Sequence, residues 1–446
     1  MNHISKGELL TIGFMMFSIF FGAGNLIFPP ALGQAAGEHV VIAMLGFLTT
    51  GVGLPLLGII AIALQGGKYI EFIRNMTYPW MATMLLVILY LTIGPLFAMP
   101  RTGAVSFEIG IRPFLAEENL SIGQLIYTAL FFGASYYLAL NPNKLIDRVG
   151  KILTPMLLII LAVLFVKAFV TPLGTIMDAT GSYIETPFVQ GFQDGYQTMD
   201  LLASLAIGTL VVNAVRMRGV TTNRAIGEIC LLAGIITVAL MAMVYGSLAY
   251  MGATSMSVLG HSENGGQLLA MAVKILFGQA GNIVIAVTIA LACLTTCCGI
   301  TSGTAWFFNK LLKNKISYER LLLLSIIFSF IASNIGLTQL INLAIPFLVG
   351  IYPLVIVLVI LSLFDRFIGW RRSIYRGAMN CTLVFAILAG MAAADINIPG
   401  VSEFLTAYLP FYSIMMGWII PALAGAFAGW LYSLVQKPQS NEKMIN

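Results

Sequence analysis

Twelve long apolar segments dominate the chain, and each is long enough to cross a lipid bilayer. Only 9% of the 446 residues are charged, whereas soluble domains carry about 25%. Hydrocarbon offers no hydrogen-bond partners, so segments of this length must satisfy their backbone internally as helices. We therefore predict an all-α polytopic membrane protein with 12 transmembrane helices, a single transmembrane domain over residues 1–446. The segments comprise residues 8–36, 39–65, 77–106, 120–140, 149–171, 189–215, 223–253, 279–312, 317–335, 338–364, 373–395 and 410–435.

The distribution of Lys and Arg predicts how these spans are oriented. With the N-terminus placed inside, 19 of the 23 basic residues fall in inner tails and loops. The outer side then holds only Arg101, Arg112, Lys167 and Lys274, the last in a short predicted surface helix over residues 265–277. Inner loops of membrane proteins carry an excess of positive charge. We therefore expect a multi-pass protein of the cell membrane with both termini in the cytoplasm.

The first apolar segment carries a helix break at its centre. This stretch reads Gly22-Ala23-Gly24-Asn25-Leu26-Ile27-Phe28-Pro29-Pro30. Two glycines weaken a regular helix, and two prolines remove amide donors and are best tolerated near a helix start. We therefore predict that one helix stops near Phe21 and a second restarts near Leu26.

A break at this depth frees backbone groups that need partners. Carbonyls near Ser18 and Phe21 can hold a cation, and the amides of Ala23, Gly24 and Asn25 can hold a carboxylate at a helix N-terminus. In membrane transporters such half-helices build substrate and ion sites. The alternative is a kink at which small residues simply let two helices pack closely.

The sixth segment is predicted to be a second broken helix, interrupted near its centre. Small residues, Ser204, Ala206 and Gly208, lie near its centre, five spans after the first break. An odd offset makes the second unit enter the membrane from the opposite side, as in an inverted five-plus-five repeat. The predicted repeats comprise residues 8–171 and 189–364, and residues 373–435 form two further spans.

Two groups of polar residues are candidates for ion chemistry. Thr295 and Thr296 in the eighth segment offer neutral oxygens of the kind that hard cations prefer, although such hydroxyls also join helices. Asp200 in the sixth segment can bind a cation, a proton or a substrate ammonium, or it can be a solvated capping residue. Arg101 is either a charge at an outer gate or a side chain that reaches the interface from a helix end.

The residue inventory excludes several classes of protein. There is no nucleotide-binding loop, no Ser/His/Asp pattern and no zinc-ligand pattern, so we expect neither an enzyme nor a cofactor. The net charge of +5 is spread over inner loops and does not indicate nucleic-acid binding. A channel would need a continuous polar lining, and a receptor would need a larger domain outside the membrane. A secondary transporter is the predicted class.

The sequence around the first break resembles the first-span signature of the branched-chain amino acid:cation symporter (LIVCS) family. The resemblance rests on Gly22-Ala23-Gly24-Asn25 followed by Leu26-Ile27-Phe28-Pro29-Pro30, and extends over nearly the whole chain. That family belongs to the amino acid–polyamine–cation superfamily and is similar in fold to the sodium-coupled leucine transporter. The resemblance implies uptake of leucine, isoleucine and valine with sodium by alternating access.

The resemblance also implies roles for residues at matching positions. A sodium ion is expected between the backbone of the first break and the eighth span, and the substrate between the two broken helices. The implied sodium ligands are Ser18, Phe21, Ala292, Thr295 and Thr296. The implied substrate contacts are Ala23, Gly24, Asn25, Ser204, Ala206, Ile207 and Gly208. Proton-coupled uptake of another neutral amino acid or solute, with Asp200 as the proton carrier, is the alternative.

Overall fold

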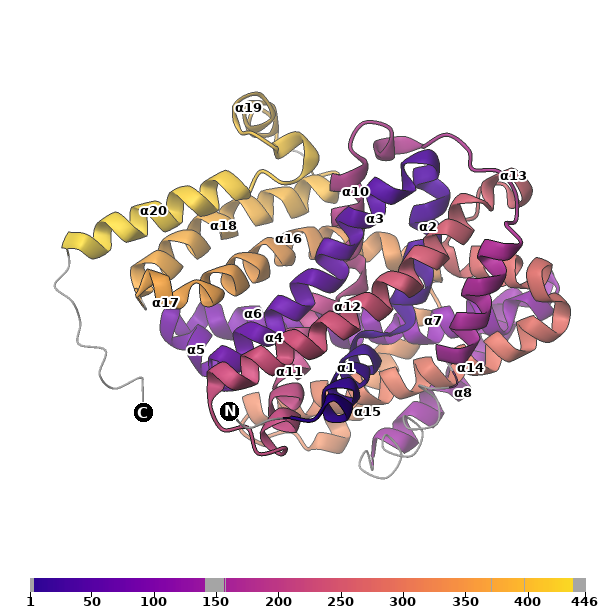
Figure 1. The fold of residues 1–446 in the computed structure, drawn as a ribbon, viewed down its shortest axis with the longest axis horizontal. Helices are drawn as coiled ribbons and strands as arrows, with labels where there is room; N and C mark the ends of the chain where they lie inside the picture. The colour runs from indigo at the N-terminus through magenta and orange to yellow at the C-terminus, as the bar shows by residue number, and fades with distance from the viewer. Residues whose placement is uncertain (1–3, 141–155, 157, 370, 397, 436–446) are drawn as a thin grey trace.

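The structure is a computed structural model that describes the chain except for residues 1–3, 141–155, 157, 370, 397 and 436–446. Every regular element among the described residues is a helix. Figure 1 shows the long helices running side by side through the body of the molecule. This arrangement agrees with the predicted all-α class, because each described apolar segment satisfies its backbone within a helix.

Helices occur in all five predicted spans of the first repeat. The first span comprises two helices, the second is interrupted by a π-helical turn, and the third contains a break. The elements are α1 (Lys6–Phe20), α2 (Ala23–Ala36), α3 (Val40–Leu48), η2 (Thr49–Gly53), α4 (Leu54–Leu64), α5 (Tyr69–Met76), α6 (Pro79–Leu91), η3 (Thr92–Leu96), α7 (Ala98–Gly110), α8 (Leu120–Ala139) and a helix over Leu158–Val170. Residues 149–155 of the fifth span lie outside the described residues.

The remaining spans are helical as well. The elements are α10 (Pro187–Asp194), η7 (Gly195–Thr198), α11 (Asp200–Arg216), α12 (Asn223–Ala253), α13 (Met256–Leu259), α14 (Gly265–Leu311), α15 (Tyr318–Ser333), α16 (Leu337–Leu363), α17 (Asp365–Ile368), α18 (Arg372–Ala393), α19 (Val401–Tyr408) and α20 (Ile419–Val435). Seven of the described helical segments are long and apolar enough to cross a membrane, or eight if the pair bent at Met199 counts as one span. The total of twelve crossings stays a prediction.

Two details of the predicted spans are wrong, and one is confirmed. The last span begins at Ile419 rather than at residue 410, because α19 and an irregular stretch occupy residues 401–418. The third span is interrupted at Gly94, whose backbone leaves helical geometry just before Pro95. Within α14, Gly278 adopts a φ of 67° and separates the predicted surface helix 265–277 from the eighth span.

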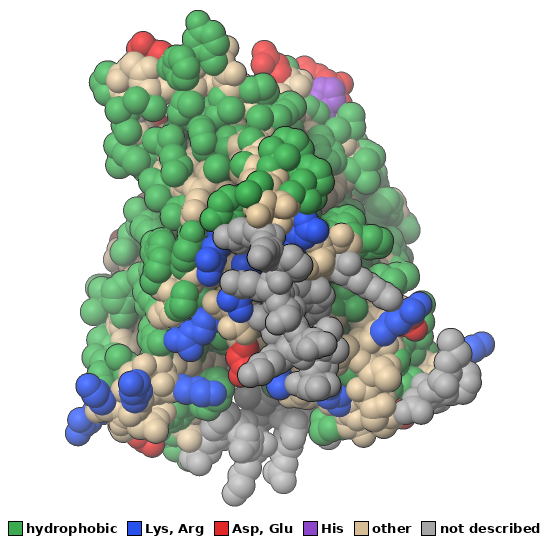
Figure 2. Space-filling model, turned by 90° about the vertical axis from the view of Figure 1, so that its left-hand side faces the viewer, with side chains coloured by type: hydrophobic (Ala, Val, Ile, Leu, Met, Phe, Trp, Pro, Cys, Tyr) green, Lys and Arg blue, Asp and Glu red, His purple; other side chains and the backbone are tan. Residues whose placement is uncertain are grey.

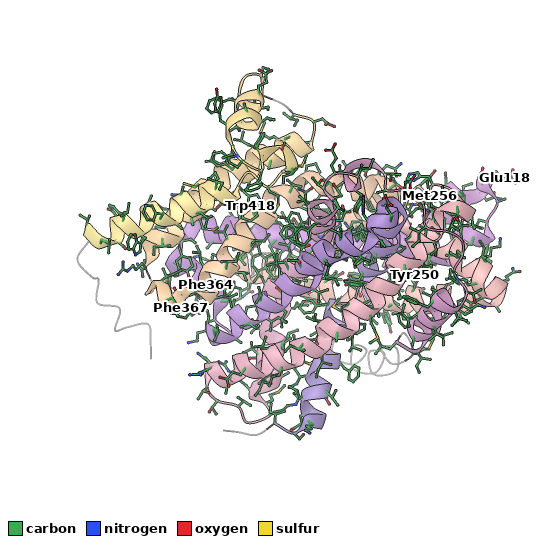
Figure 3. The ribbon with its side chains drawn as sticks, turned by 45° about the horizontal axis from the view of Figure 1, so that its top comes forward. Glu118, Tyr250, Met256, Phe364, Phe367 and Trp418 are labelled. Atoms are coloured by element: carbon green, nitrogen blue, oxygen red, sulfur yellow. The ribbon has the colours of Figure 1, made fainter. Side chains whose placement is uncertain are left out.

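Loops assigned to opposite sides of the membrane lie at opposite ends of the molecule. Figure 3 shows Glu118 and Met256, both in predicted outer loops, far from Phe364 and Phe367, which border a predicted inner loop. Figure 2 looks onto the end that holds α5 and α17 and shows Lys and Arg side chains gathered there. The alternation of loop sides is therefore consistent with the charge pattern, and the side that faces the cytoplasm stays a prediction.

Close glycine contacts join four of the helices in two pairs. A Cβ on Gly33 of α2 would lie 1.9 Å from the Ala249 carbonyl oxygen of α12, and one on Gly252 would lie 2.0 Å from that of Pro30. In α10 and α3, Gly191 and Gly46 approach the opposite backbone in the same way. Only glycine permits such contact, as at many membrane helix interfaces. Span one thus pairs with span seven and span six with span two, as a five-span offset requires.

Candidate functional site

The first break is where the sequence places it. Helix α1 ends at Phe20, Phe21 and Gly22 are extended, and α2 starts at Ala23, slightly earlier than the predicted restart. The Gly22 amide leaves the helical ladder and donates to Asn25 Oδ1 at 3.2 Å. Asn25 thereby caps the second half-helix from its third position. The first turn of α2, with its amides that lack helical partners, is buried within the protein.

The second break lies at Met199, and the predicted break at Ser204–Gly208 is wrong. Helix α11 is regular from Asp200 to Arg216, whereas Met199 has a φ of 60° and separates it from η7. The two halves meet at a bend of 46°. The small residues serve packing instead, since a Cβ on Gly208 would lie 2.7 Å from Ile62 of α4. A glycine within a helix need not break it when a neighbouring helix requires the space.

The four predicted substrate contacts in α11 therefore occupy different surroundings. Ser204 is buried against α4, since a Cβ on Gly58 would lie 2.3 Å from its Oγ, and its hydroxyl donates to the Leu201 carbonyl at 2.7 Å. Ala206 and Ile207 are half-buried, and the Ala206 carbonyl accepts a 3.4 Å hydrogen bond from the Tyr90 hydroxyl. Ala206 and Ile207 consequently remain candidates for a pocket wall, whereas Ser204 and Gly208 hold α11 against α4.

A buried polar cluster joins the two breaks. Asn25 is 1% exposed, and its Nδ2 donates to Asp200 Oδ2 at 2.7 Å and to the Tyr245 hydroxyl of α12. Asp200, 4% exposed, is the first residue of α11, and its amide donates to Thr198 Oγ1 at 3.3 Å. The first turns of both second half-helices therefore meet at one point. Two helix N-termini facing one site favour an anionic ligand group.

Arg101 of α7 also lies at this point. It is 3% exposed, which rules out the interpretation as a side chain that reaches the interface from a helix end. Its Nη1 donates to the Gln197 carbonyl at 2.5 Å, two residues before the second break, and its guanidinium lies over the Phe28 ring at 4.9 Å. The sequence indicated Arg101 only as an outer-gate or interface charge, because its position between the two breaks depends on the kink at Gly94 that precedes α7. The Gly94-Pro95 pair was the available signal.

Of the predicted sodium ligands on the eighth span, Thr296 lies beside the first break. A Cβ on Gly22 would lie 3.7 Å from Thr296 Cγ2, so the eighth span borders the first break. The Thr295 hydroxyl donates to the Ala292 carbonyl at 2.9 Å, which leaves the oxygen lone pairs for another partner. Phe21 is buried and Ser18 is exposed on the last turn of α1. The sequence thus identifies two segments that lie together.

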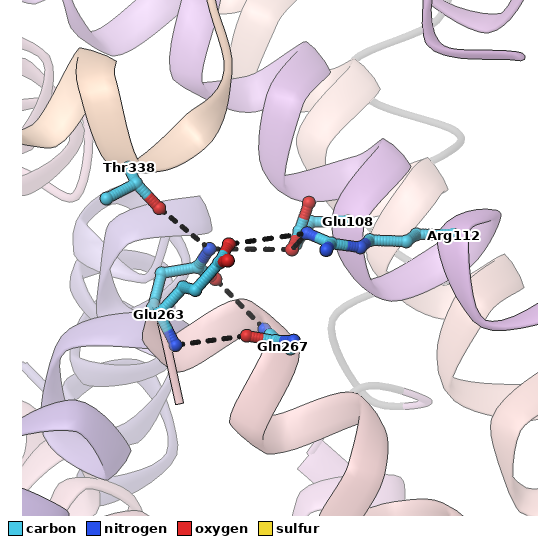
Figure 4. A network of polar contacts seen from close by, with 6 residues as sticks. Glu108, Arg112, Glu263, Gln267 and Thr338 are labelled. Carbon is cyan, nitrogen blue, oxygen red and sulfur yellow. Dashed lines mark hydrogen bonds and ion pairs between the residues drawn. The ribbon is translucent and has the colours of Figure 1, made fainter. Parts of the chain in front are cut away.

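A second polar network joins the C-terminal end of α7 to α14 and α16, as Figure 4 shows. Glu108 Oε1 accepts from Arg112 Nη1 at 2.5 Å and from Asn264 Nδ2 at 3.4 Å. Asn264 Nδ2 also donates to Thr338 Oγ1 at 3.1 Å, and its Oδ1 accepts from the Gln267 amide at 2.9 Å. This network stabilises the predicted outer end above the site, and no sequence pattern indicated it.

Solved structures identify the fold. The fold resembles that of MhsT in complex with L-phenylalanine, with a TM-score of 0.57, 16% identity, and coverage of 96% of this chain and 98% of that chain. It also resembles Mhp1, a nucleobase-cation-symport-1 family transporter, with a TM-score of 0.55, 15% identity, and coverage of 95% and 92%. These likenesses show a leucine-transporter-like membrane transporter fold.

The family follows from the sequence comparisons. Residues 5–436 match the family model for branched-chain amino acid transport proteins, and the chain belongs to that family. It is 46% identical to the branched-chain amino acid permease BraB of Bacillus subtilis, over 98% of both chains. It is 43% identical to the branched-chain amino acid transport system 2 carrier protein of Pseudomonas aeruginosa, over 94% of this chain and 95% of that protein. The chain is a transporter rather than an enzyme.

Proposed function

We propose that this protein carries leucine, isoleucine and valine into the cell together with sodium, by alternating access. The observation that supports this most is the hydrogen bond from Asn25 to Asp200, which joins both broken helices at one buried point. Sites between two half-helices suit a small zwitterion and a coupling ion. The names of the relatives support branched-chain amino acids as the substrates.

The substrate is expected to lie against the first turn of α2. The amides of Ala23, Gly24 and Asn25 supply hydrogen-bond donors, and the helix dipole favours a carboxylate beside them. Ala206 and Ile207 are the proposed apolar contacts on α11, because both are only half-buried. An aliphatic side chain would gain affinity there by leaving water.

Sodium is the proposed coupling ion because the nearby oxygens are neutral. The proposed ligands are the backbone carbonyls of Ser18, Phe21 and Ala292 and the hydroxyls of Thr295 and Thr296. None of these groups titrates near neutral pH, so they suit a metal cation better than a proton. The position of Thr296 beside Gly22 supports this assignment.

The close glycine pairs support a transport cycle in which spans one, two, six and seven move together. The contacts of Gly33 with α12 and of Gly191 with α3 bring backbones too close for either pair to slide. These four spans are therefore proposed to rock as one body against the others, exposing the site to each side in turn.

Proton coupling through Asp200 is the second candidate, and the burial of this carboxyl favours it. Uptake of labelled leucine into proteoliposomes, with sodium and pH gradients imposed separately, tests both. We expect accumulation with an inward sodium gradient alone. Accumulation with a pH gradient alone, lost in Asp200→Asn, would replace sodium by the proton. No accumulation under either gradient would contradict the proposed substrates.

A further inference from the structure

Arg101 has a buried guanidinium with two unused nitrogens. Nη1 donates to the Gln197 carbonyl, whereas Nε and Nη2 have no hydrogen-bond partner among the described residues. The side chain is only 3% exposed, so bulk water does not replace those partners. Burying an unpaired charge is costly, and buried cations are normally paired with an anion. The structure therefore contains a cation that lacks its counter-charge.

The protein itself does not supply that counter-charge. No acidic side chain among the described residues lies within 4.0 Å of the Arg101 guanidinium, which lies instead over the face of the Phe28 ring. Asp200 is buried nearby, and Tyr352 lies close enough to interact electrostatically with both groups. The site thus holds one positive and one negative group that do not form an ion pair.

The guanidinium faces the first half-helix break. Its Nη1 would lie 3.4 Å from a Cβ on Gly24, so the absence of a side chain at Gly24 leaves this approach open. Gln197, whose carbonyl accepts from Arg101, and its chain neighbour Tyr196 also have buried side-chain oxygens without a hydrogen-bond partner among the described residues. Unused buried polar atoms on residues that contact or adjoin one another indicate a place for a polar ligand.

We propose that Arg101 binds the α-carboxylate of the amino acid substrate. Nε and Nη2 form one edge of the guanidinium, whose two parallel N–H groups match the two oxygens of a carboxylate. The substrate ammonium would then point toward Asp200, so one zwitterion neutralises both buried charges. This inference rests on the proposed function and adds a side-chain partner to the backbone amides of α2.

Binding of leucine and of leucinamide by the purified protein tests the proposal, because leucinamide has a neutral amide in place of the carboxylate. We expect Arg101→Met to weaken leucine binding roughly 10- to 100-fold, the range expected for loss of a charged hydrogen bond. Leucinamide binding should change by less than about threefold, since its amide makes no ion pair. The thermal stability of the ligand-free variant should not fall, because an unpaired buried cation is removed.

A matched variant and a conservative variant complete the test. Arg112→Met removes a guanidinium that lies after the end of α7 and pairs with Glu108. It should leave the ratio of leucine affinity to leucinamide affinity unchanged. Arg101→Lys keeps the charge but cannot form a bidentate pair with a carboxylate, so this affinity ratio should fall less than in Arg101→Met. If Arg101→Met does not fold, Arg101→Lys decides, and an unchanged ratio overturns the proposal.

The outcomes separate this proposal from the proposed function. Equal weakening of both ligands in Arg101→Met would show that Arg101 only shapes the site, and would overturn the inference. An unchanged ratio in an active Arg101→Met protein would overturn it as well, with leucine transport intact. Failure of the unmodified protein to bind leucine would instead contradict the proposed function.

Discussion

Asn25 Nδ2 donates a 2.7 Å hydrogen bond to Asp200 Oδ2, which joins residues 175 positions apart in the chain. Each residue lies in the first turn of a half-helix that begins at a break, so this bond connects α2 to α11. Asn25 also accepts from the Gly22 amide, and therefore holds the shape of the first break as well as its link to the second.

Asn25→Ala is expected to abolish leucine uptake and to destabilise the protein. The substitution removes a donor from the buried Asp200 carboxyl and an acceptor from the Gly22 amide. Each group left without a partner costs about 1–3 kcal/mol. Thermal unfolding in detergent and leucine uptake per folded protein measure the two effects.

Asn309→Ala is the matched control for this substitution. It also loses a hydrogen bond, from Nδ2 to the Ile316 carbonyl at 2.8 Å, but far along α14 from the breaks. It should lower stability while uptake per folded protein persists. Normal uptake by Asn25→Ala would show that the link between the two breaks is not needed for transport.

Thr295→Ala and Thr296→Ala are expected to raise the sodium concentration needed for half-maximal uptake. Removing one hydroxyl ligand from the ion should cost about 1–3 kcal/mol, or roughly a five- to hundredfold rise in that sodium concentration. Thr288→Ala in the same helix is the control, because Thr288 is buried and its hydroxyl donates to the Val284 carbonyl of its own helix. Uptake measured against sodium concentration distinguishes them, and parental curves in both threonine variants would contradict a sodium site here.

Asp365→Asn is expected to stabilise the protein at neutral pH and not in acid. Asp365 follows α16, is 2% exposed and accepts a 3.0 Å hydrogen bond from the Tyr375 hydroxyl. Burial raises the pKa of this carboxyl to about 6 from 3.8. Because the folded state holds the proton more tightly, the stability contributed in acid is lost as pH rises from about 4 to 6.

Melting temperatures measured from pH 4 to pH 8 test this prediction. The asparagine keeps an acceptor for Tyr375 without a charge, so its advantage should be absent near pH 4, grow between about pH 4 and pH 6, and level off above that. Glu403→Gln, which alters an exposed carboxyl on α19, is the control and should give a parental profile. A parental profile for Asp365→Asn would instead show that ionisation of the buried carboxyl does not lower the stability of the protein.

Cysteines placed in two loops test the predicted orientation. His261 and Asn314 are exposed in loops on either side of the eighth span. His261→Cys should react with a membrane-impermeant thiol reagent in intact cells, whereas Asn314→Cys should react only after lysis. The unmodified protein controls for its own cysteines, four of which are buried. Labelling of Asn314→Cys in intact cells would contradict the predicted alternation of loops between the two sides of the membrane.

Features that depend on local backbone chemistry were predictable from the sequence. The first break is encoded by Gly22 and the residues after it, because glycine and proline disfavour continued helix wherever the segment packs. The end of the surface helix at Gly278, with its φ of 67°, has the same origin. The helical spans themselves follow from apolar length, since hydrocarbon allows few other solutions.

Tertiary packing decided the second break and the position of Arg101. Met199 has no intrinsic preference for its φ of 60°, and its conformation is held by neighbours, including the Tyr196 carbonyl that accepts from its amide at 3.0 Å. Gly208 lies where a helix break was predicted, but its missing side chain instead leaves space for Ile62 of α4. Arg101 looked peripheral until α7, redirected after Gly94, carried it between the half-helices. For Gly208 and Arg101, contacts with helices distant in the sequence, rather than local preference, decided the outcome.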